Sequence, residues 1–287
     1  MGRFTIGKLG SNSLKNDLCI SQSADGEIYV ISDYHRSIVK LHCLKNAIGS
    51  NSVMRIGVMQ PYFFPYLGYF HLAKAVDILV LTDDYKFTKQ SWINRNRIIS
   101  EKKIEYMTIP LMKSSDSTHI NKKVIALDFK SNNLQNKLYN SYHSAVNYMG
   151  LCNILNSENF YPKANLFDAL EKSLKVTLNY LGIKTAIMKT SEFQFPELAT
   201  GKDKILQICS ALGGSEYVNL SGGKSLYNSG DFSRASVKLS FVNSRFYEYK
   251  QNNEGFNSGL SIIDVIASNT YEDLIKTHLL SFELTSK

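Results

Sequence analysis

Apolar and polar positions divide the chain into short strands and amphipathic helices. Residues 55–59 (RIGVM) are mostly apolar, which is typical of a strand buried in a parallel sheet. A helix is predicted to begin at Gly68, because apolar residues then recur near helical spacing as far as Val76. Residues 76–81 (VDILVL) indicate a second buried strand. Together the three elements form a βαβ unit.

Strands and helices continue to alternate downstream. Leu134, Leu138 and Tyr142 predict a helix from 132 to about 148, and leucines four apart predict another over 165–180. We also expect a helix at 202–212, a helix that begins within 259–264, an extended segment at 122–127, and strands at 105–110, 185–189, 217–220, 237–242 and 245–251. The pattern predicts an α/β fold: a three-layer, open, mainly parallel sheet with flanking helices.

Polar and aromatic residues gather where the first two strands end. Gln60 follows the first strand, Asp83 and Asp84 follow the second, and Tyr66 and Tyr69 lie between them. Ligands of open parallel sheets bind beyond the carboxyl ends of the strands, so these five residues are expected to converge on one crevice. The competing interpretation is an ordinary aromatic core.

A second polar segment, residues 89–99 (KQSWINRNRII), holds the only tryptophan. Beside it lie Asn94, Arg95, Asn96 and Arg97, whose amide and guanidinium donors suit phosphate, carboxylate or sugar hydroxyls. In an extended segment the two asparagines face one way and the two arginines the other, so only one pair is expected to line a site. For the arginines, the alternative is a solvated basic edge.

Glycines and a lysine follow the strand predicted at 217–220. Gly222 and Gly223 let backbone N–H groups approach a phosphate or carboxylate, while Lys224 adds charge and Tyr227 a hydroxyl. The spacing is not that of a Walker loop, so a plain turn is the competing interpretation.

Composition narrows the function classes. With 287 residues, 44% of them hydrophobic, the chain is long enough to bury a full α/β core. A net charge of +8 favours anionic ligands. The basic residues are scattered, and no basic helix carries interleaved aromatics, so nucleic acid such as a tRNA-borne acyl donor has only weak support.

Cysteines and histidines are widely spaced. Four cysteines without a CxxC pair predict free thiols in a reducing compartment. No apolar run is long enough for a membrane span or a signal peptide, so a cytoplasmic protein is expected. The histidines lack metal-ligand spacing, so no metal site is expected. His71 is expected on the surface, with a place in the crevice as the alternative.

Several blocks in order resemble one protein family. Residues 60–70 (QPYFFPYLGYF), the aspartate pair and residues 92–98 (WINRNRI), followed by blocks at 217–232, 248–251 and 259–264, resemble the WbqC-like protein family. The resemblance runs from Met54 to near the end of the chain. That family is found among genes for O-antigen (lipopolysaccharide) and other surface polysaccharides. The resemblance implies aminoacyl or acyl transfer to a nucleotide-linked amino sugar.

The PYLGYF segment also resembles, more distantly, the opening of nucleotidylyltransferases with an HxGH motif. In those enzymes two histidines at a helix N-terminus contact the nucleotide phosphates. Here Tyr66 and Tyr69 take the histidine positions, and tyrosine carries no positive charge near neutral pH. Gly68 and the helix N-terminus still suit an anion. Phosphate binding is therefore better supported than adenylyl transfer.

Residues 1–53 are expected to be an extension to a domain of residues 54–287. Within the extension, residues 24–41 (ADGEIYVISDYHRSIVKL) indicate two strands around a polar turn and resemble one blade of an NHL-type β-propeller. One blade cannot close a propeller. Because the family-like region begins at Met54, we expect a mis-assigned start or a fused remnant that packs poorly on the domain.

Two functions from different classes follow. In the first, a transferase binds the nucleotide-linked amino sugar through the asparagine, arginine and glycine-turn residues, needs no cofactor beyond an activated acyl donor, and uses Asp84 as base. Asp83 and Asp264 are the alternative bases, although Asp264 and Ser261 also fit a helix capping box. Neither Cys152 nor Cys209 lies in a recognisable histidine-paired context, so direct transfer is the simpler scheme. In the second, the domain is a binding or assembly factor for polysaccharide enzymes, or a degenerate nucleotide binder.

Overall fold

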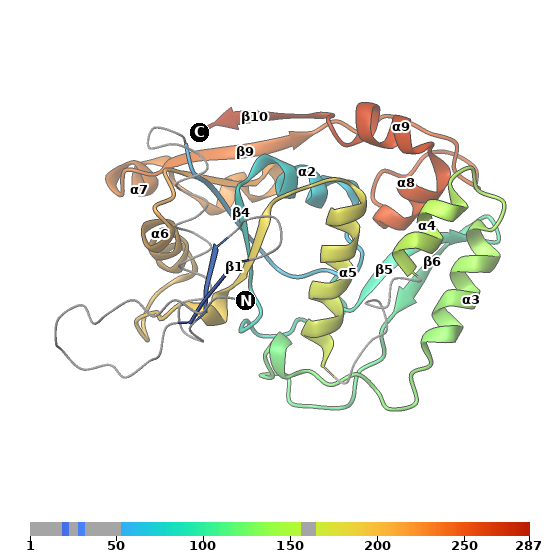
Figure 1. The fold of residues 1–287 in the computed structure, drawn as a ribbon, viewed down its shortest axis with the longest axis horizontal. Coiled ribbons are helices and arrows are strands. Elements are labelled where there is room, and N and C mark those ends of the chain that lie inside the picture. The colour runs from blue at the N-terminus through green and yellow to red at the C-terminus, as the bar shows by residue number, and fades with distance from the viewer. Residues whose placement is uncertain (1–18, 23–27, 32–52, 156–164) are drawn as a thin grey trace.

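The computed structural model describes residues 19–22, 28–31, 53–155 and 165–287, and its centre is a six-stranded sheet (Figure 1). The strand order is β10-β9-β8-β3-β4-β7, with β10 antiparallel to β9 and the other pairs parallel. This mostly parallel sheet with flanking helices confirms the predicted α/β class. The strands are β3 (Arg55–Met59), β4 (Ile78–Leu81), β7 (Ala186–Lys189), β8 (Glu216–Leu220), β9 (Lys238–Ser244) and β10 (Phe282–Ser286).

Side chains of successive residues in the central strands pack into two separate hydrophobic cores, one on each face of the sheet. Ile56 and Tyr217 pack on one face of the sheet, whereas Leu79 and Val218 pack on the other, as the alternation of side chains along a strand requires. Ile56 is fully buried, so truncation to alanine should cost about 2–5 kcal/mol. The first face is covered by α6 (Gly201–Leu212) and α7 (Ser229–Arg234), and the second by α2 (Leu67–Ala75), α5 (Leu166–Tyr180) and α8 (Ile262–Ser268).

A separate hairpin extends the second core (Figure 1). Strands β5 (Arg95–Ser100) and β6 (Lys103–Thr108) are joined by Glu101 and Lys102, whose φ angles of +50° and +62° are those of a type I′ turn. Neither residue is the glycine or asparagine that such a turn favours, which is why the sequence did not reveal it. Strand β5 packs with α3 (Ser131–Tyr142) and α8, and α4 (Tyr148–Leu155) packs with α8 and α5.

Most predicted elements are present. The helix expected over 132–148 ends at Tyr142, and α4 follows as a separate helix. The strand expected at 245–251 is wrong, because those residues join no ladder. The edge strand β10 was not anticipated. The remaining short elements are η1 (Ile120–Lys122), η2 (Thr190–Glu192), η3 (Ser221–Leu226), α9 (Tyr271–Asp273) and the π-helix η4 (Leu274–His278).

Two short strands are described before the domain. β1 (Cys19–Gln22) and β2 (Ile28–Ile31) pair in antiparallel fashion. β2 falls within the 24–41 segment predicted to form strands, whereas the rest of that segment and most of the 1–53 extension lie outside the described residues. Across the described ranges, no helix combines the length and the hydropathy that a bilayer span needs.

Candidate active site

A cavity of about 730 Å³ lies at the switch point of the sheet. β3 has β4 on one side and β8 on the other, so the chain leaves β3 in one direction and later returns on the other side. Met59 and Gln60 at the end of β3, and Asn219 and Leu220 at the end of β8, lie on the cavity wall. This is the position where open α/β sheets bind ligands. We call this space the β3–β8 cavity.

The wall of the β3–β8 cavity is rich in hydroxyl and amide groups. Its one lysine is Lys202, and none of the described residues that line it is a carboxylate. Burial raises the pKa of Tyr62, Tyr66 and Tyr85, so these phenols stay neutral at pH 7. The wall therefore suits a neutral or anionic ligand. Its polar side chains are Gln60, Tyr62, Tyr66, Thr82, Tyr85, Lys202, Asn219, Ser221, Tyr227 and Ser244.

Gln60 and Tyr66 lie on this wall, but Tyr69 does not. Tyr69 is fully buried, and its hydroxyl donates to the backbone carbonyl of Gln60 at 3.1 Å. Gly68 lies against the Tyr66 ring, because an added Cβ would stand 2.5 Å from Tyr66 Cε2. Of the two tyrosines at the HxGH positions, only Tyr66 faces the cavity.

The predicted glycine turn also reaches the cavity. Gly222 and Gly223 of η3, together with Tyr227, line it. Gly223 lies close to Asn219, where an added Cβ would be 3.1 Å from Nδ2. Lys224 is not on the wall: it is exposed, and its Nζ donates to Asn243 Oδ1 at 3.1 Å.

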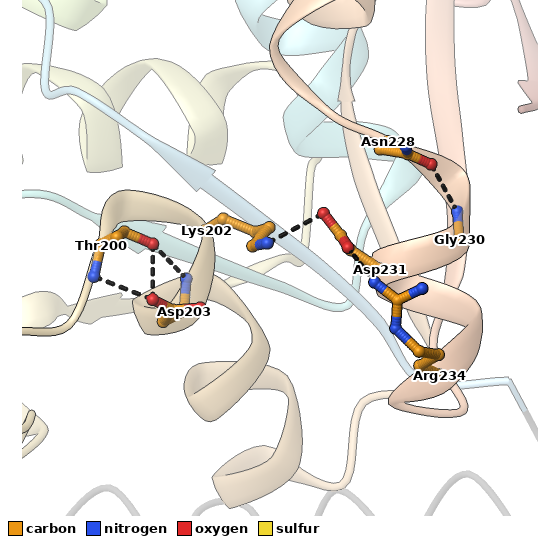
Figure 2. Close-up of polar contacts among 7 residues, drawn as sticks. All are labelled: Thr200, Lys202, Asp203, Asn228, Gly230, Asp231 and Arg234. Atoms are coloured by element: carbon orange, nitrogen blue, oxygen red, sulfur yellow. Dashed lines mark hydrogen bonds and ion pairs between the residues drawn. The ribbon is translucent and has the colours of Figure 1, made fainter.

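Lys202, in the first turn of α6, supplies the positive charge that was expected from Lys224. Thr200 and Asp203 close a capping box, which sets where the helix begins. Lys202 Nζ lies 2.9 Å from Asp231 Oδ2, and Asp231 also pairs with Arg234 (Figure 2). The hydrogen bond from Lys202 is the main reason that the pKa of Asp231 is lowered. A half-exposed pair of this kind adds little stability, so Lys202 is available to a ligand.

Asp83, expected at the crevice, is buried behind the wall. Its carboxylate accepts hydrogen bonds from Ser191 N–H at 3.0 Å, Ser191 Oγ at 2.7 Å, Asn121 Nδ2 at 3.0 Å and Thr190 Oγ1 at 3.2 Å. Burial alone would raise the pKa of Asp83, but these donors outweigh it and hold the pKa below its ordinary value. The group therefore acts as an anchor between loops and is a weak base.

Asp84 lies beside the cavity without lining it. It is half-buried and accepts a hydrogen bond from Thr190 Oγ1. Its neighbour Tyr85 does line the cavity, as does Thr82, whose buried Oγ1 has no hydrogen-bond partner among the described residues. Besides burial, the charge of Asp84 helps to raise the pKa of Tyr85, so the carboxylate acts electrostatically on the wall.

Asn96 of β5 and Asn94, which precedes that strand, hydrogen-bond to backbone carbonyls instead of lining the cavity. Asn96 is buried, and its Nδ2 donates to the carbonyls of Phe63 at 3.1 Å and Phe64 at 2.7 Å. Phe64 has a φ of +42°, an unfavourable value for a bulky residue, so these bonds fix a strained loop. Asn94 Nδ2 donates to the Ile109 carbonyl at 2.8 Å. The asparagines thus shape the loop that carries Tyr66.

The two arginines are half-buried, and both are engaged with protein. Arg95 donates to the Gln90 carbonyl at 2.6 Å, and Arg97 to the Gly259 carbonyl at 2.9 Å. Their guanidinium groups lie over aromatic rings: Arg95 is 4.5 Å from the Tyr106 ring centre, and Arg97 is 5.1 Å from that of Trp92. Neither lines the β3–β8 cavity.

Asp264 belongs to a buried network away from the cavity wall. It accepts hydrogen bonds from Tyr142 Oη at 2.9 Å, Tyr249 Oη at 2.7 Å and Gln251 Nε2 at 3.2 Å. Burial raises its pKa. Ser261 caps α8 as predicted, by accepting from the N–H of Ile263 at 3.3 Å, but its own N–H donates to Arg97, so the capping box is not formed.

His71 is fully buried, so its expected surface position is wrong. Its Nδ1 lies 2.8 Å from Oγ of Ser244, a wall residue that sequence reasoning missed. The missed Lys202 does have a local signal, since it follows the Thr200 cap of α6 by two residues. In the described part of the chain, histidine, cysteine and acidic side chains form no group of three that could hold a metal ion.

Comparison with known proteins identifies the family. The model of the WbqC-like protein family matches residues 60–275, which is most of the chain. A Mycobacterium tuberculosis protein named "Uncharacterized protein Rv1507c" is 26% identical over 219 residues, which cover 74% of this chain and 92% of that protein. No solved structure matches, so the resemblance to HxGH nucleotidylyltransferases stays a prediction. On the extent of the family match, the chain belongs to the WbqC-like protein family.

Proposed function

We propose that the β3–β8 cavity binds a nucleotide-linked amino sugar, and that the domain transfers an acyl or aminoacyl group to the sugar amine during surface polysaccharide biosynthesis. One observation carries this proposal: a cavity of about 730 Å³ at the switch point, with a hydroxyl- and amide-rich wall, one lysine and no carboxylate among its described lining residues. Ligand sites typically measure ~300–1,000 Å³.

Each part of such a ligand has a matching group on the wall. Lys202 and the N–H groups of Gly222 and Gly223 suit phosphate oxygens. Gln60 is oriented for a sugar hydroxyl, because its Oε1 accepts from Tyr62 at 3.3 Å and its amide N–H groups have no acceptor within the described part of the chain. Phe246 and the tyrosines offer apolar surface to a ring.

The transfer itself is a substitution at the acyl carbon. The sugar amine forms the new C–N bond, the bond from the acyl carbon to its carrier breaks, and the amine proton leaves through a base. Of the three carboxylates expected as bases, Asp84 directly precedes Tyr85 of the cavity wall, and its charge helps to raise the pKa of Tyr85. Asp83 and Asp264 are held by hydrogen bonds within the protein.

Native mass spectrometry of the full chain tests the binding step. The panel contains UDP- and dTDP-linked amino sugars, ATP, acyl-CoA compounds and aminoacyl-tRNA. We expect an amino-sugar nucleotide to be retained. Lys202→Gln should weaken its binding about 10–150-fold through loss of a charge-assisted hydrogen bond worth ~1.5–3 kcal/mol.

Lys175→Gln is the matched control. Lys175 is also a helical lysine that pairs with a carboxylate, Glu171 at 2.7 Å, and it does not line the cavity. The same charge change there should leave binding near the wild-type level. A panel without a binder would contradict the transferase and favour an assembly factor. Equal losses of affinity in both variants would show that Lys202 acts only through the net charge of the protein and makes no direct contact with the ligand.

A further inference from the structure

Ser244 and His71 form a hydrogen-bonded pair at the edge of the β3–β8 cavity. Ser244 is the last residue of β9, and its side chain is part of the cavity wall. His71 belongs to α2 and is fully buried behind it. The distance between Ser244 Oγ and His71 Nδ1 is 2.8 Å. An accessible hydroxyl therefore meets a ring nitrogen that water does not reach.

The second ring nitrogen fixes the tautomer of His71. Its Nε2 lies 2.8 Å from the backbone carbonyl oxygen of His278, which can only accept a hydrogen bond. The neutral ring must therefore carry its proton on Nε2, which leaves the lone pair of Nδ1 for the Ser244 hydroxyl. Phe246 and Phe282 stack against the ring at centroid distances of 6.1 and 5.3 Å and hold its plane.

We propose that Ser244 is a nucleophile activated by His71, and that it carries the acyl group as an ester between the activated donor and the sugar amine. The inference rests on the proposed function, and it replaces direct transfer by a two-step route. The arrangement of a nucleophile, a base and a group that orients the base is the one that covalent catalysis requires. The orienting group here is a backbone carbonyl.

The two steps balance without any further reactant. In the first, Ser244 Oγ bonds to the carbonyl carbon of an activated ester or thioester, its proton passes to His71 Nδ1, and the carrier leaves and takes that proton. In the second, the sugar amine attacks the same carbon and gives a proton to His71 Nδ1. The C–O bond to Ser244 then breaks, and Oγ regains the proton.

Other candidate nucleophiles are less well placed. Ser221 also lines the cavity but is exposed, and the described residues place no histidine against it. Cys209 is buried in the core on the α6 side of the sheet, and burial raises the pKa of its thiol to about 12. Ser244 thus combines exposure to the cavity with a base.

Covalent labelling of the full chain tests the proposal. The probe is diisopropyl fluorophosphate: Ser244 Oγ bonds to phosphorus, fluoride leaves, and the serine proton departs with it through His71. We expect one adduct by intact-protein mass spectrometry, mapped to Ser244 by peptide mass. Ser244→Ala should lose it, and His71→Gln should slow labelling at least ~100-fold. The control Ser233→Ala, at an exposed serine of α7 that does not line the cavity, should label at the wild-type rate.

The pH profile separates a base from a packing residue. Burial is the main effect on His71 and lowers its pKa. The hydrogen bond to the His278 carbonyl raises this pKa, and the charge of the His278 ring, the titratable group that faces His71, lowers it, so the pKa stays below the ordinary value. The labelling rate should rise with pH and reach half its maximum below 6.5, the ordinary value for histidine. A rate that is flat over pH 5–8 would contradict the role of His71.

Three results would overturn the inference: no adduct on the unmutated chain, an adduct that survives in Ser244→Ala, or a wild-type rate in His71→Gln. The first needs no variant, so misfolding of a mutant cannot obscure it. Sugar-nucleotide binding is measured on the same preparation. Binding without labelling refutes the nucleophile alone, whereas labelling without any bound amino-sugar nucleotide refutes the proposed function alone.

Discussion

A methyl group added at Gly68 should disturb the β3–β8 cavity without unfolding the protein. An added Cβ would lie 2.5 Å from Tyr66 Cε2 and 2.9 Å from Cζ, whereas ordinary contact begins at 3.4 Å. The ring must therefore shift by roughly 0.9 Å, the difference between 3.4 and 2.5 Å. Phe246 packs on it at a centroid distance of 6.3 Å, so the shift changes the cavity wall that both rings form.

The effect on binding can be worked from these contacts. A misplaced Tyr66 loses a hydrogen bond to the ligand worth ~1 kcal/mol and packing of its ring on the ligand worth ~0.5–1.5 kcal/mol. The Kd for the ligand should therefore rise about 10–70-fold. Alanine is favoured over glycine within a helix by ~1 kcal/mol, which offsets the cost of moving the ring. The melting temperature should therefore change by only a few degrees.

Isothermal titration calorimetry with the amino-sugar nucleotide retained by the wild type measures this difference. Gly201→Ala, at the first residue of α6, is the matched control, because nothing lies within 4 Å of the Cβ it would add, although Gly201 also lines the cavity. The control should bind like the wild type. The reasoning is refuted if Gly68→Ala binds equally well, or if both variants lose the same affinity.

Two further predictions concern buried carboxylates. Burial alone would raise the pKa of Glu216, but hydrogen bonds from Ser240, Arg55 and Lys238 outweigh it and lower that pKa. The ionised carboxylate therefore stabilises the fold at neutral pH, and this contribution fades as pH falls below about 4.5. Glu216→Gln should cost about 2–4 kcal/mol in urea unfolding at pH 7, and the difference from wild type should shrink in acid; equal stability at pH 7 would contradict it. Burial raises the pKa of Asp264, so unfolding free energy should fall as pH rises from about 3.8 through the folded value. Asp264→Asn should remove this dependence of the unfolding free energy on pH. An unchanged pH dependence in the variant would show that other groups cause it.

Local signals explain which elements could be predicted. The helix α6 has a Thr200 cap at one end and Gly213, with a φ of +65°, at the other, and both are visible in the sequence. In contrast, residues 245–251 alternate like a strand but have no partner strand. Tyr249 and Gln251 instead turn towards Asp264, a partner the sequence does not reveal. The edge strand β10 depends on pairing with β9 and leaves no local signal.

The cavity was predictable only where residues follow a strand directly. Gln60 is the first residue after β3 and Gly222 the second after β8, so the strand-end rule places them on the wall. The amide of Asn96 was expected to bind a ligand, but it donates to the backbone carbonyls of Phe63 and Phe64. Residue type alone does not show whether an amide bonds to a ligand or to backbone. Ser244 and His71 are 173 positions apart, and only the packing of β9 against α2 brings them together.

A crystal structure of the full chain with the retained amino-sugar nucleotide is the most direct test of the account. We predict ligand density in the β3–β8 cavity, with phosphate oxygens within hydrogen-bond distance of Lys202 or the Gly222–Gly223 backbone, and the sugar amine near Ser244 Oγ. Density at another surface, or a β3–β8 cavity that holds only water at saturating ligand, would contradict the central claim.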